Sequence, residues 1–210
     1  MNALNSFESD LRRAVLSLRF LVAVGMQLAI LLTDGYGSTL YQMSVPLACT
    51  LPYASGWLEE YKGGFVRLAL VRTTMRGYIL GKYFGCTVAG GCAEVLALWL
   101  NTRLQGEPAP CSYGTLFLTA AVWAGTAAVL AALSNSKYLA YGGAFVVCYF
   151  LVILCERYWP GLYCLYPYEW LEPTHTWVWG GIGLNLLLAA LAGVLLLWYW
   201  LILQGRVERG

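Results

Sequence analysis

The chain has 210 residues, of which 60% are apolar and only 11% are charged, and its mean hydropathy is +0.62. This composition excludes an ordinary soluble globular protein and places the chain among membrane proteins. The formal net charge of +2 gives no support to nucleic-acid binding, and the single histidine and the cysteine spacings match no metal site.

The first seventeen residues predict an amphipathic helix. Leu4, Phe7, Leu11 and Val15 recur at steps of three or four, with charged residues on the other sides. We expect this segment, residues 1–17, to lie in the cytoplasmic interface of the membrane and to turn into the first span like an elbow. The alternative is a first span that simply begins early.

Six apolar runs account for most of the chain, and about 20 residues are enough for a helix to cross the hydrocarbon core. They are residues 18–33, 39–58, 78–100, 115–133, 138–154 and 178–203. We therefore predict one all-α membrane domain, residues 1–210, with spans one and two in 18–58, a cytoplasmic segment at 59–77, spans three to five in 78–154, an outer interfacial loop at 155–177, span six at 178–203 and a tail at 204–210. Pro46 and Pro52 favour a kink or a break in the second run.

Basic residues predict the orientation of these spans. Six crossings place both termini on one side, and that side carries eleven of the thirteen lysines and arginines: Arg12, Arg13, Arg19, Lys62, Arg67, Arg72, Arg76, Lys82, Lys137, Arg206 and Arg209. Only Arg103 and Arg157 fall on the other side. By the positive-inside rule, both termini are cytoplasmic in a multi-pass protein of the cell membrane. Because no A-x-A-like site follows the first run, we expect it to remain as a signal anchor.

The third run carries a small residue at every fourth position, so that these residues share one ridge of a helix. Such ridges predict close helix packing, here within the protomer or across a dimer. The ridge consists of Gly77, Gly81, Gly85, Ala89 and Ala93.

Glu94 lies beside this ridge, inside the predicted span. An ionisable residue within a membrane is a functional candidate by default. Two interpretations remain open. Glu94 lines a translocation path, together with Asn185 of the last run, or it belongs to helix packing as a carboxyl that is protonated or paired with a neighbour such as Asn185.

The outer loop at 155–177 is dense in tyrosine and tryptophan, which favour the headgroup level of a membrane. We expect this loop to lie on or dip into the outer interface, with His175 solvated. Cys111, Cys155 and Cys164 lie at or beyond the outer ends of spans, where one disulfide remains open.

The stretch "GWLEEYKGGFVRLALVRTTMRGYILGK" contains seven charges between residues 59 and 82. At about 2.5 to 3.5 kcal/mol for each charge at the bilayer centre, the stretch belongs outside the membrane. Gly63 and Gly64 predict a break, followed by a short helix with Phe65 and Leu68 on one side and Arg67 on another; Lys82 would anchor the next span at the interface. The segment either docks on a cytoplasmic partner or rests on the headgroups.

"GYILGKY" is similar to a phosphate-binding loop, but it has one residue too few between its glycines and Tyr83 in place of Ser or Thr. We therefore expect no ATP hydrolysis by this chain, no catalytic residue and no cofactor of its own.

The longer stretch "WLEEYKGGFVRLALVRTTMRGYILGKYFG" resembles permease subunits of ABC type-2 transporters, as do the six-span order, the amphipathic start and the short "LSNSKY" turn. The resemblance implies an exporter of the bacterial cell membrane that pairs with a second copy or a homologous permease and binds a separately encoded ATPase, which carries ATP and magnesium. It places the coupling helix between Glu59 and Arg72, with Glu59, Glu60, Gly63, Gly64, Phe65, Arg67, Leu68 and Arg72. Thr73 and Thr74 stand where the family often has proline.

Three other classes compete with this interpretation. A six-span substrate-capture subunit of an energy-coupled vitamin or metal importer has a similar length, but the long segment after the second span argues against it. An intramembrane protease would use a glutamate pair such as Glu59 and Glu60, yet no suitable histidines accompany the pair. The third class is a membrane scaffold. No motif indicates the substrate.

Overall fold

A computed structural model describes residues 3–106, 108–159, 161–177 and 181–207; the side chains of residues 3–6, 67, 72 and 207 are not described. All regular structure in these residues is helical. The α-helices are α1 (Ala3–Val15), α2 (Leu18–Thr33), α3 (Thr39–Ala48), α4 (Gly56–Lys62), α5 (Val66–Arg72), α6 (Met75–Gln105), α7 (Tyr113–Ser134), α8 (Lys137–Ile153), α9 (Pro167–Leu171) and α10 (Gly181–Val207). A π-turn covers Leu154–Tyr158 and a 3-10 turn covers Tyr163–Leu165.

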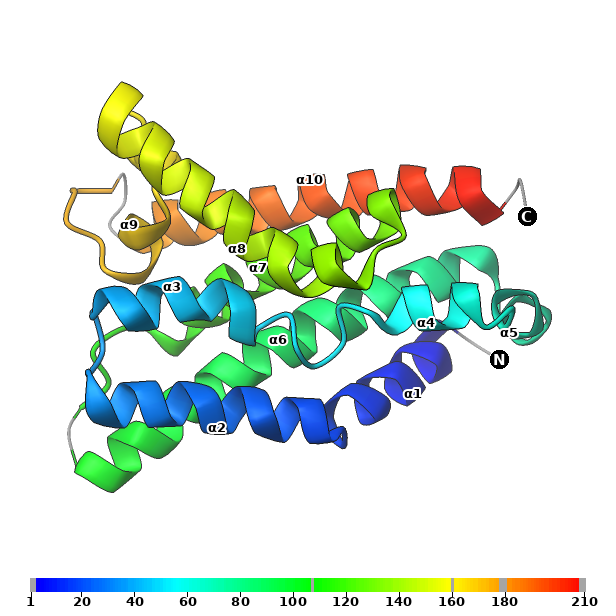
Figure 1. Cartoon of the computed structure of the whole chain (residues 1–210), viewed down its shortest axis with the longest axis horizontal. Coiled ribbons are helices and arrows are strands. Elements are labelled where there is room, and N and C mark those ends of the chain that lie inside the picture. The colour runs from blue at the N-terminus through cyan, green and yellow to red at the C-terminus, as the bar shows by residue number, and fades with distance from the viewer. Residues whose placement is uncertain (1–2, 107, 160, 178–180, 208–210) are drawn as a thin grey trace.

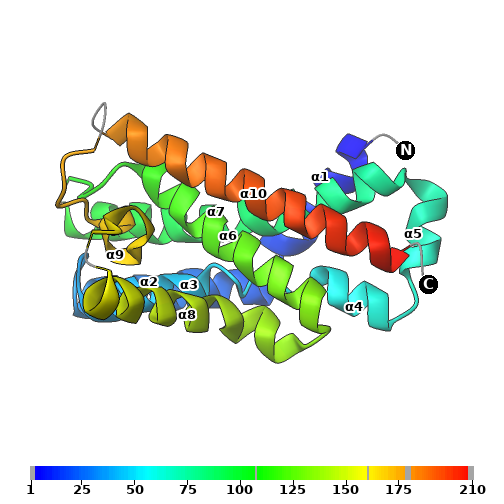
Figure 2. The same cartoon turned by 90° about the horizontal axis from the view of Figure 1, so that it is seen from above.

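The long helices run side by side along the longest axis of the molecule, with α5 at one end and α9 at the other (Figures 1 and 2). The start of α1 and the end of α10 lie at the α5 end. Helix α7 is the central element, because 72% of its apolar stretch is buried within the protein, whereas only 17% of the apolar stretch of α10 is buried. The exposed side chains of α10 are apolar except Gln204 near its end, as expected for a helix that faces lipid.

Four described helices are long and apolar enough to cross a bilayer: α6, α7, α10, and α8 together with the π-turn that follows it. A fifth span results if residues 7–15 of α1 and helix α2, which are bent by 54° relative to each other, are counted as one. The described part of the chain is therefore all-helical, with four or five helices of membrane-spanning length. The predicted start of the last span, residues 178–180, lies outside the described residues.

The second predicted span is not a continuous helix but is broken, which is one of the two outcomes that Pro46 and Pro52 favour in residues 39–58. Helix α3 ends at Ala48, and turns occupy residues 49–55 before α4 begins. Proline at positions 46 and 52 removes two backbone donors that a helix would use. Part of the broken backbone is hydrogen-bonded locally, because the Thr50 N–H donates to the carbonyl oxygen of Leu47 at 3.2 Å. The Thr50 hydroxyl lies 2.7 Å from the same oxygen and 3.1 Å from the carbonyl oxygen of Tyr141 on α8. Such partners are what irregular backbone inside a membrane requires.

Helix α1 packs on α6 through a face that its amphipathic pattern does not indicate. Asp10 and Ala14 are buried, whereas Val15 is 37% exposed and Leu18, at the start of α2, is 75% exposed. Gly85 allows this approach, because a Cβ placed there would lie 3.3 Å from the Cβ of Asp10. The face of α1 that packs on α6 is therefore set by the small residues Ala14 and Gly85 and by the ion pair of Asp10 with Lys82. Apolar side chains of α1 remain on its exposed side.

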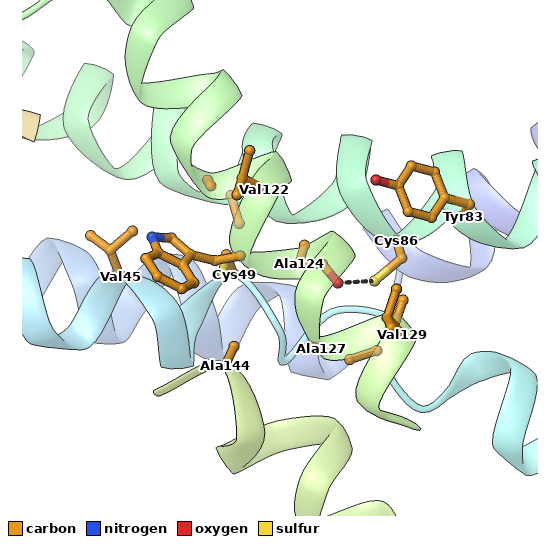
Figure 3. Packing of buried hydrophobic residues seen from close by; sticks show 14 of the residues in the cluster. Val45, Cys49, Tyr83, Cys86, Val122, Ala124, Ala127, Val129 and Ala144 are labelled. Carbon is orange, nitrogen blue, oxygen red and sulfur yellow. Dashed lines mark hydrogen bonds between the residues drawn. The ribbon is translucent and has the colours of Figure 1, made fainter. Parts of the chain in front are cut away.

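Small residues allow the central helices to approach closely. Figure 3 shows Cys86 of α6 directed at Ala124 of α7, whose carbonyl oxygen accepts from its thiol at 3.5 Å. A Cβ at Gly90 would lie 2.5 Å from the carbonyl oxygen of Cys49, so α6 and the end of α3 nearly touch. The predicted ridge of small residues is buried along its whole length: Gly77, Gly81, Gly85, Ala89 and Ala93.

All seven cysteines lie in the described part of the chain and are free thiols. Cys111, Cys155 and Cys164, for which the sequence leaves a disulfide open, are therefore not joined in this structure.

Candidate functional site

A buried ion cluster joins three segments at the α5 end. The ammonium group of Lys82 on α6 donates to Asp10 Oδ1 of α1 at 2.7 Å, to Glu60 Oε1 of α4 at 2.6 Å and to the Tyr53 hydroxyl at 2.8 Å. The side chains of Lys82 and Asp10 are only 2% and 5% exposed. We call Asp10, Tyr53, Glu60, Tyr78 and Lys82 the Lys82 cluster.

The remaining members complete the hydrogen bonding of the Lys82 cluster. The Tyr53 hydroxyl donates to Asp10 Oδ1 at 2.5 Å, and the Tyr78 hydroxyl donates to Glu60 Oε2 at 2.9 Å. Arg13 of α1 lies 3.3 Å from Glu60 Oε1 at the exposed edge. Buried charges are tolerated when they are paired and hydrogen-bonded in this way. Lys82 is thus an internal ion-pair partner, which corrects its predicted role as an interface anchor.

The neighbouring carboxylate, Glu59, connects α4 to two further helices. Arg19 of α2 donates from one nitrogen to Glu59 Oε1 at 3.0 Å, to the Ser55 hydroxyl at 3.0 Å and to the Tyr141 hydroxyl of α8 at 2.9 Å. Burial raises the pKa of the Glu59 carboxyl, but hydrogen bonds from Ser55 and Arg19 outweigh this effect and lower it overall. The negative form of Glu59 is therefore stabilised.

A third contact ties α4 to the last helix. The guanidinium carbon of Arg206 on α10 lies 5.7 Å from the centre of the Trp57 ring on α4. Arg206 also donates to the side chain of Asn135 and, at 2.7 Å, to the carbonyl oxygen of Leu133, where α7 turns into α8. Helix α4 thus has polar or cation–π contacts with α1, α2, α6, α8 and α10.

Helix α5, in contrast, projects from the bundle with apolar side chains exposed. Phe65, Leu68 and Val71 are 59%, 62% and 86% exposed, while Val66 is buried against the bundle. The turn before α5 depends on Gly64, whose φ of +71° belongs to the left-handed region that favours glycine. A cavity of about 510 Å³ lies beneath α5, lined by Asp10, Arg13, Glu60, Phe65, Leu68 and Lys82 among others.

The predicted coupling residues therefore divide into two groups. Glu59 and Glu60 are engaged by other helices of the bundle, whereas Phe65 and Leu68 are mostly exposed and line the cavity beneath α5. Gly63 and Gly64 form the break between them. Arg67 and Arg72 belong to α5, but their side chains lie outside the described ones.

A second polar group lies deep inside the bundle. The side-chain amide of Gln27 on α2 donates to Glu94 Oε1 of α6 at 2.8 Å, and the Ser44 hydroxyl of α3 donates to Gln27 Oε1 at 2.7 Å. We call Glu94, Gln27 and Ser44 the Glu94 chain. Glu94 is fully buried. Its Oε2 atom and the Tyr41 hydroxyl have no hydrogen-bond partner among the described residues.

Glu94 and Asn185, considered together from the sequence, have different partners. Glu94 accepts from Gln27, whereas the amide oxygen of Asn185 accepts from the Thr115 hydroxyl of α7 at 2.9 Å. The structure does not show the pairing between Glu94 and Asn185 that the sequence left open, because each has another partner.

The loop at the α9 end holds a third buried carboxyl. Glu169 is 2% exposed and accepts the backbone N–H of His175 at 2.6 Å and the Thr174 hydroxyl at 2.7 Å. The half-exposed His175 ring stacks on Tyr163, with ring centres 4.8 Å apart, so this histidine is held in place and is not simply solvated. Burial raises the pKa of Glu169, but the hydrogen bonds from His175 and Thr174 outweigh it and lower the pKa.

The part of the chain that the structure describes contains no group of three or more histidine, cysteine, aspartate or glutamate side chains placed to hold a metal ion. The "GYILGKY" stretch forms the early turns of α6, where Gly77 and Gly81 are buried and Lys82 is occupied by carboxylates. No known protein family, curated protein or solved structure matches this chain.

Sequence reasoning missed most members of both polar groups. The available signal was a polar residue within an apolar run, as with Gln27 and Ser44, or a carboxylate within an amphipathic helix, as with Asp10. Their partners are not local, since Lys82 lies 72 positions from Asp10 and Glu94 lies 67 positions from Gln27.

Proposed function

We propose that this chain is the membrane permease subunit of an ATP-driven ABC type-2 transporter in the bacterial cell membrane. In this proposal α5 docks on a separately encoded ATPase, which binds ATP and magnesium. The observation that carries the proposal is the contrast between α5 and α4. Helix α5 exposes apolar side chains, and α4, one turn away, is connected to five other helices of the bundle.

The exposed face of α5 has the character of an interaction surface. Phe65 and Leu68 leave apolar area in contact with solvent on a segment that also carries basic residues, which keeps it out of the hydrocarbon. An apolar groove on a partner would remove this area from water. Burying side chains of this size contributes about 1.5 to 3 kcal/mol each.

The contacts of α4 provide a route by which a force on α5 would reach the bundle. Glu60 connects α4 to α1 and α6, Glu59 connects it to α2, and Ser55, the residue before α4, connects it to Tyr141 of α8. Trp57 adds the contact with Arg206 of α10. We propose that closure of the ATPases pushes α5, that α4 moves with it, and that these contacts change the relative positions of the spans.

The membrane arrangement in this proposal has six crossings: α2, the broken stretch 39–58, α6, α7, α8 and α10. Helix α1 lies at the cytoplasmic interface as an elbow. The α5 end faces the cytoplasm, because the described basic residues gather there except Arg103, in the last turn of α6, and Arg157, in the π-turn after α8. A second copy or a homologous permease completes the transporter, and export is the direction that the family resemblance implies.

The test is recovery of the ATPase with the tagged chain in a mild detergent. The double variant Phe65→Ser with Leu68→Ser should reduce the recovered ATPase at least tenfold, because both substitutions remove apolar area from the docking face. The variant should unfold at the same temperature as the wild type, since both side chains are mostly exposed.

The matched control is Leu16→Ser, at an exposed leucine in the break between α1 and α2. It should leave ATPase recovery unchanged. Full recovery with the double variant, or absence of any ATPase from the wild-type preparation, would contradict the proposal.

A further inference from the structure

Glu94 lies in the middle of the bundle, where no charged side chain among the described residues pairs with it. It lies twelve residues beyond Lys82 on α6, which corresponds to about 18 Å along the helix axis. No charged side chain of the described residues interacts with its carboxyl, and its one hydrogen bond comes from the neutral amide of Gln27. An isolated carboxylate in such surroundings would lack the compensation that buried charges require.

The ionisable groups on the helices around Glu94 do not supply this compensation. The side chains of α3 and its C-terminal cap that interact electrostatically with Glu94 are Tyr41 and Cys49. In α2 the ionisable residue is Arg19, which is engaged by Glu59 at the α5 end. The remaining ionisable residues on the helices packed against α6 are Tyr113 of α7, Tyr199 and Arg206 of α10, and the residues of α1, α4 and α5 at the α5 end.

We propose that Glu94 is a proton-binding site, and that its carboxyl carries a proton on Oε2 in the arrangement seen here. Two atoms without partners support this assignment, namely Glu94 Oε2 and the Tyr41 hydroxyl. A protonated carboxyl has one O–H donor. The Tyr41 hydroxyl interacts electrostatically with Glu94 but makes no direct hydrogen bond to it here, and it can accept from the carboxyl through one bridging water. Glu94 Oε1 keeps its hydrogen bond from Gln27 in either protonation state.

Release of the proton requires a change in the surrounding helices. The negative carboxylate that remains needs water or a cation at Oε2, and Glu94 is fully enclosed. The enclosing wall includes the end of α3, where Gly90 of α6 approaches the carbonyl oxygen of Cys49. Separation of α3 from α6 would admit water. Because residues 49–55 connect α3 to α4, proton release is linked to movement of α4; this link rests on the proposed function, whereas the proton site itself does not.

The test is infrared spectroscopy of the purified full chain in dodecyl maltoside, a detergent without a carbonyl group. At neutral pH the wild type should show the C=O stretching band of a protonated carboxylic acid, and the band should shift on exchange into D₂O. Glu94→Gln should abolish the band. Tyr41→Phe should keep its intensity and move it to higher frequency, because the carboxyl loses its acceptor.

Glu169→Gln is the matched control, since Glu169 is also buried but accepts hydrogen bonds from the His175 N–H and the Thr174 hydroxyl, which favour its charged form. It should leave the protonated-acid band in place and reduce only the carboxylate bands. A wild-type spectrum without a protonated-acid band at neutral pH would overturn the proposal without any variant, as would a band that persists in folded Glu94→Gln protein. The ATPase takes no part in these measurements, so failure of the proposed function would leave their outcome unchanged.

Discussion

The Lys82 cluster and the Glu94 chain are both built around a residue of α6, and both place ionisable side chains in the protein interior, but they compensate the burial in different ways. In the Lys82 cluster, two carboxylates surround one ammonium group, and each charge is paired and hydrogen-bonded. In the Glu94 chain, a single carboxyl has one neutral donor and one oxygen without a partner. The comparison teaches that burial alone does not define the role of an acidic residue. Paired charges hold helices together, whereas an unpaired carboxyl is suited to bind a proton.

The largest effect should follow from removing the cation of the Lys82 cluster. Lys82→Met keeps the length of the side chain but leaves Asp10 and Glu60 without their buried partner, which should cost about 3 to 5 kcal/mol. The measurement is the free energy or midpoint of unfolding in detergent, together with the monodisperse fraction recovered. Lys62→Met, at an exposed lysine of α4, is the control and should change little. If Lys82→Met were as stable as the wild type, the Lys82 cluster would not hold the helices together, and its contrast with the Glu94 chain would be lost.

An intermediate effect should follow from cutting the Glu94 chain at its centre. Gln27→Leu removes the donor to Glu94 and the acceptor of Ser44, and a buried polar group without its partner costs about 1 to 3 kcal/mol. The same unfolding measurement applies, and the protonated-acid band of Glu94 should shift as its hydrogen bond is lost. The exposed Gln105 provides the control, Gln105→Leu. If Gln27→Leu lowered the free energy of unfolding as much as Lys82→Met does, the result would indicate an ionised Glu94.

The smallest effect should be confined to the loop at the α9 end, where Glu169 offers a third buried carboxyl. Its pKa lies below the ordinary value of 4.5, so the folded state favours its charged form. The stability that Glu169 contributes is therefore fully present above about pH 4.5 and is lost as the pH falls through its lower folded-state pKa. Tryptophan fluorescence, to which the neighbouring Trp170 contributes, should report this acid transition. An identical transition in Glu169→Gln would assign it to another group.

The positions of most helices follow from local sequence. The run 18–33 coincides with α2, and 115–133 and 138–154 differ from the helices by a few residues at their ends. The break at Gly63 and Gly64 and the short helix after it also appear where the glycines indicate them. Hydropathy, helical period and backbone freedom are properties of neighbouring residues, so the sequence can reveal them without knowledge of the fold.

The partners inside the bundle are a different matter, because only the tertiary structure decided them. The second apolar run breaks at residues 49–55 rather than bending. Within this break, the Thr50 hydroxyl donates to the carbonyl oxygen of Tyr141, 91 positions away. Asp10 turns inward because Gly85 makes room for α1 and Lys82 supplies a charge. Sequence alone determined that this chain forms apolar helices with a polar segment between them. Packing determined which polar atoms are paired and which are left alone, since that depends on helices brought together from distant parts of the chain.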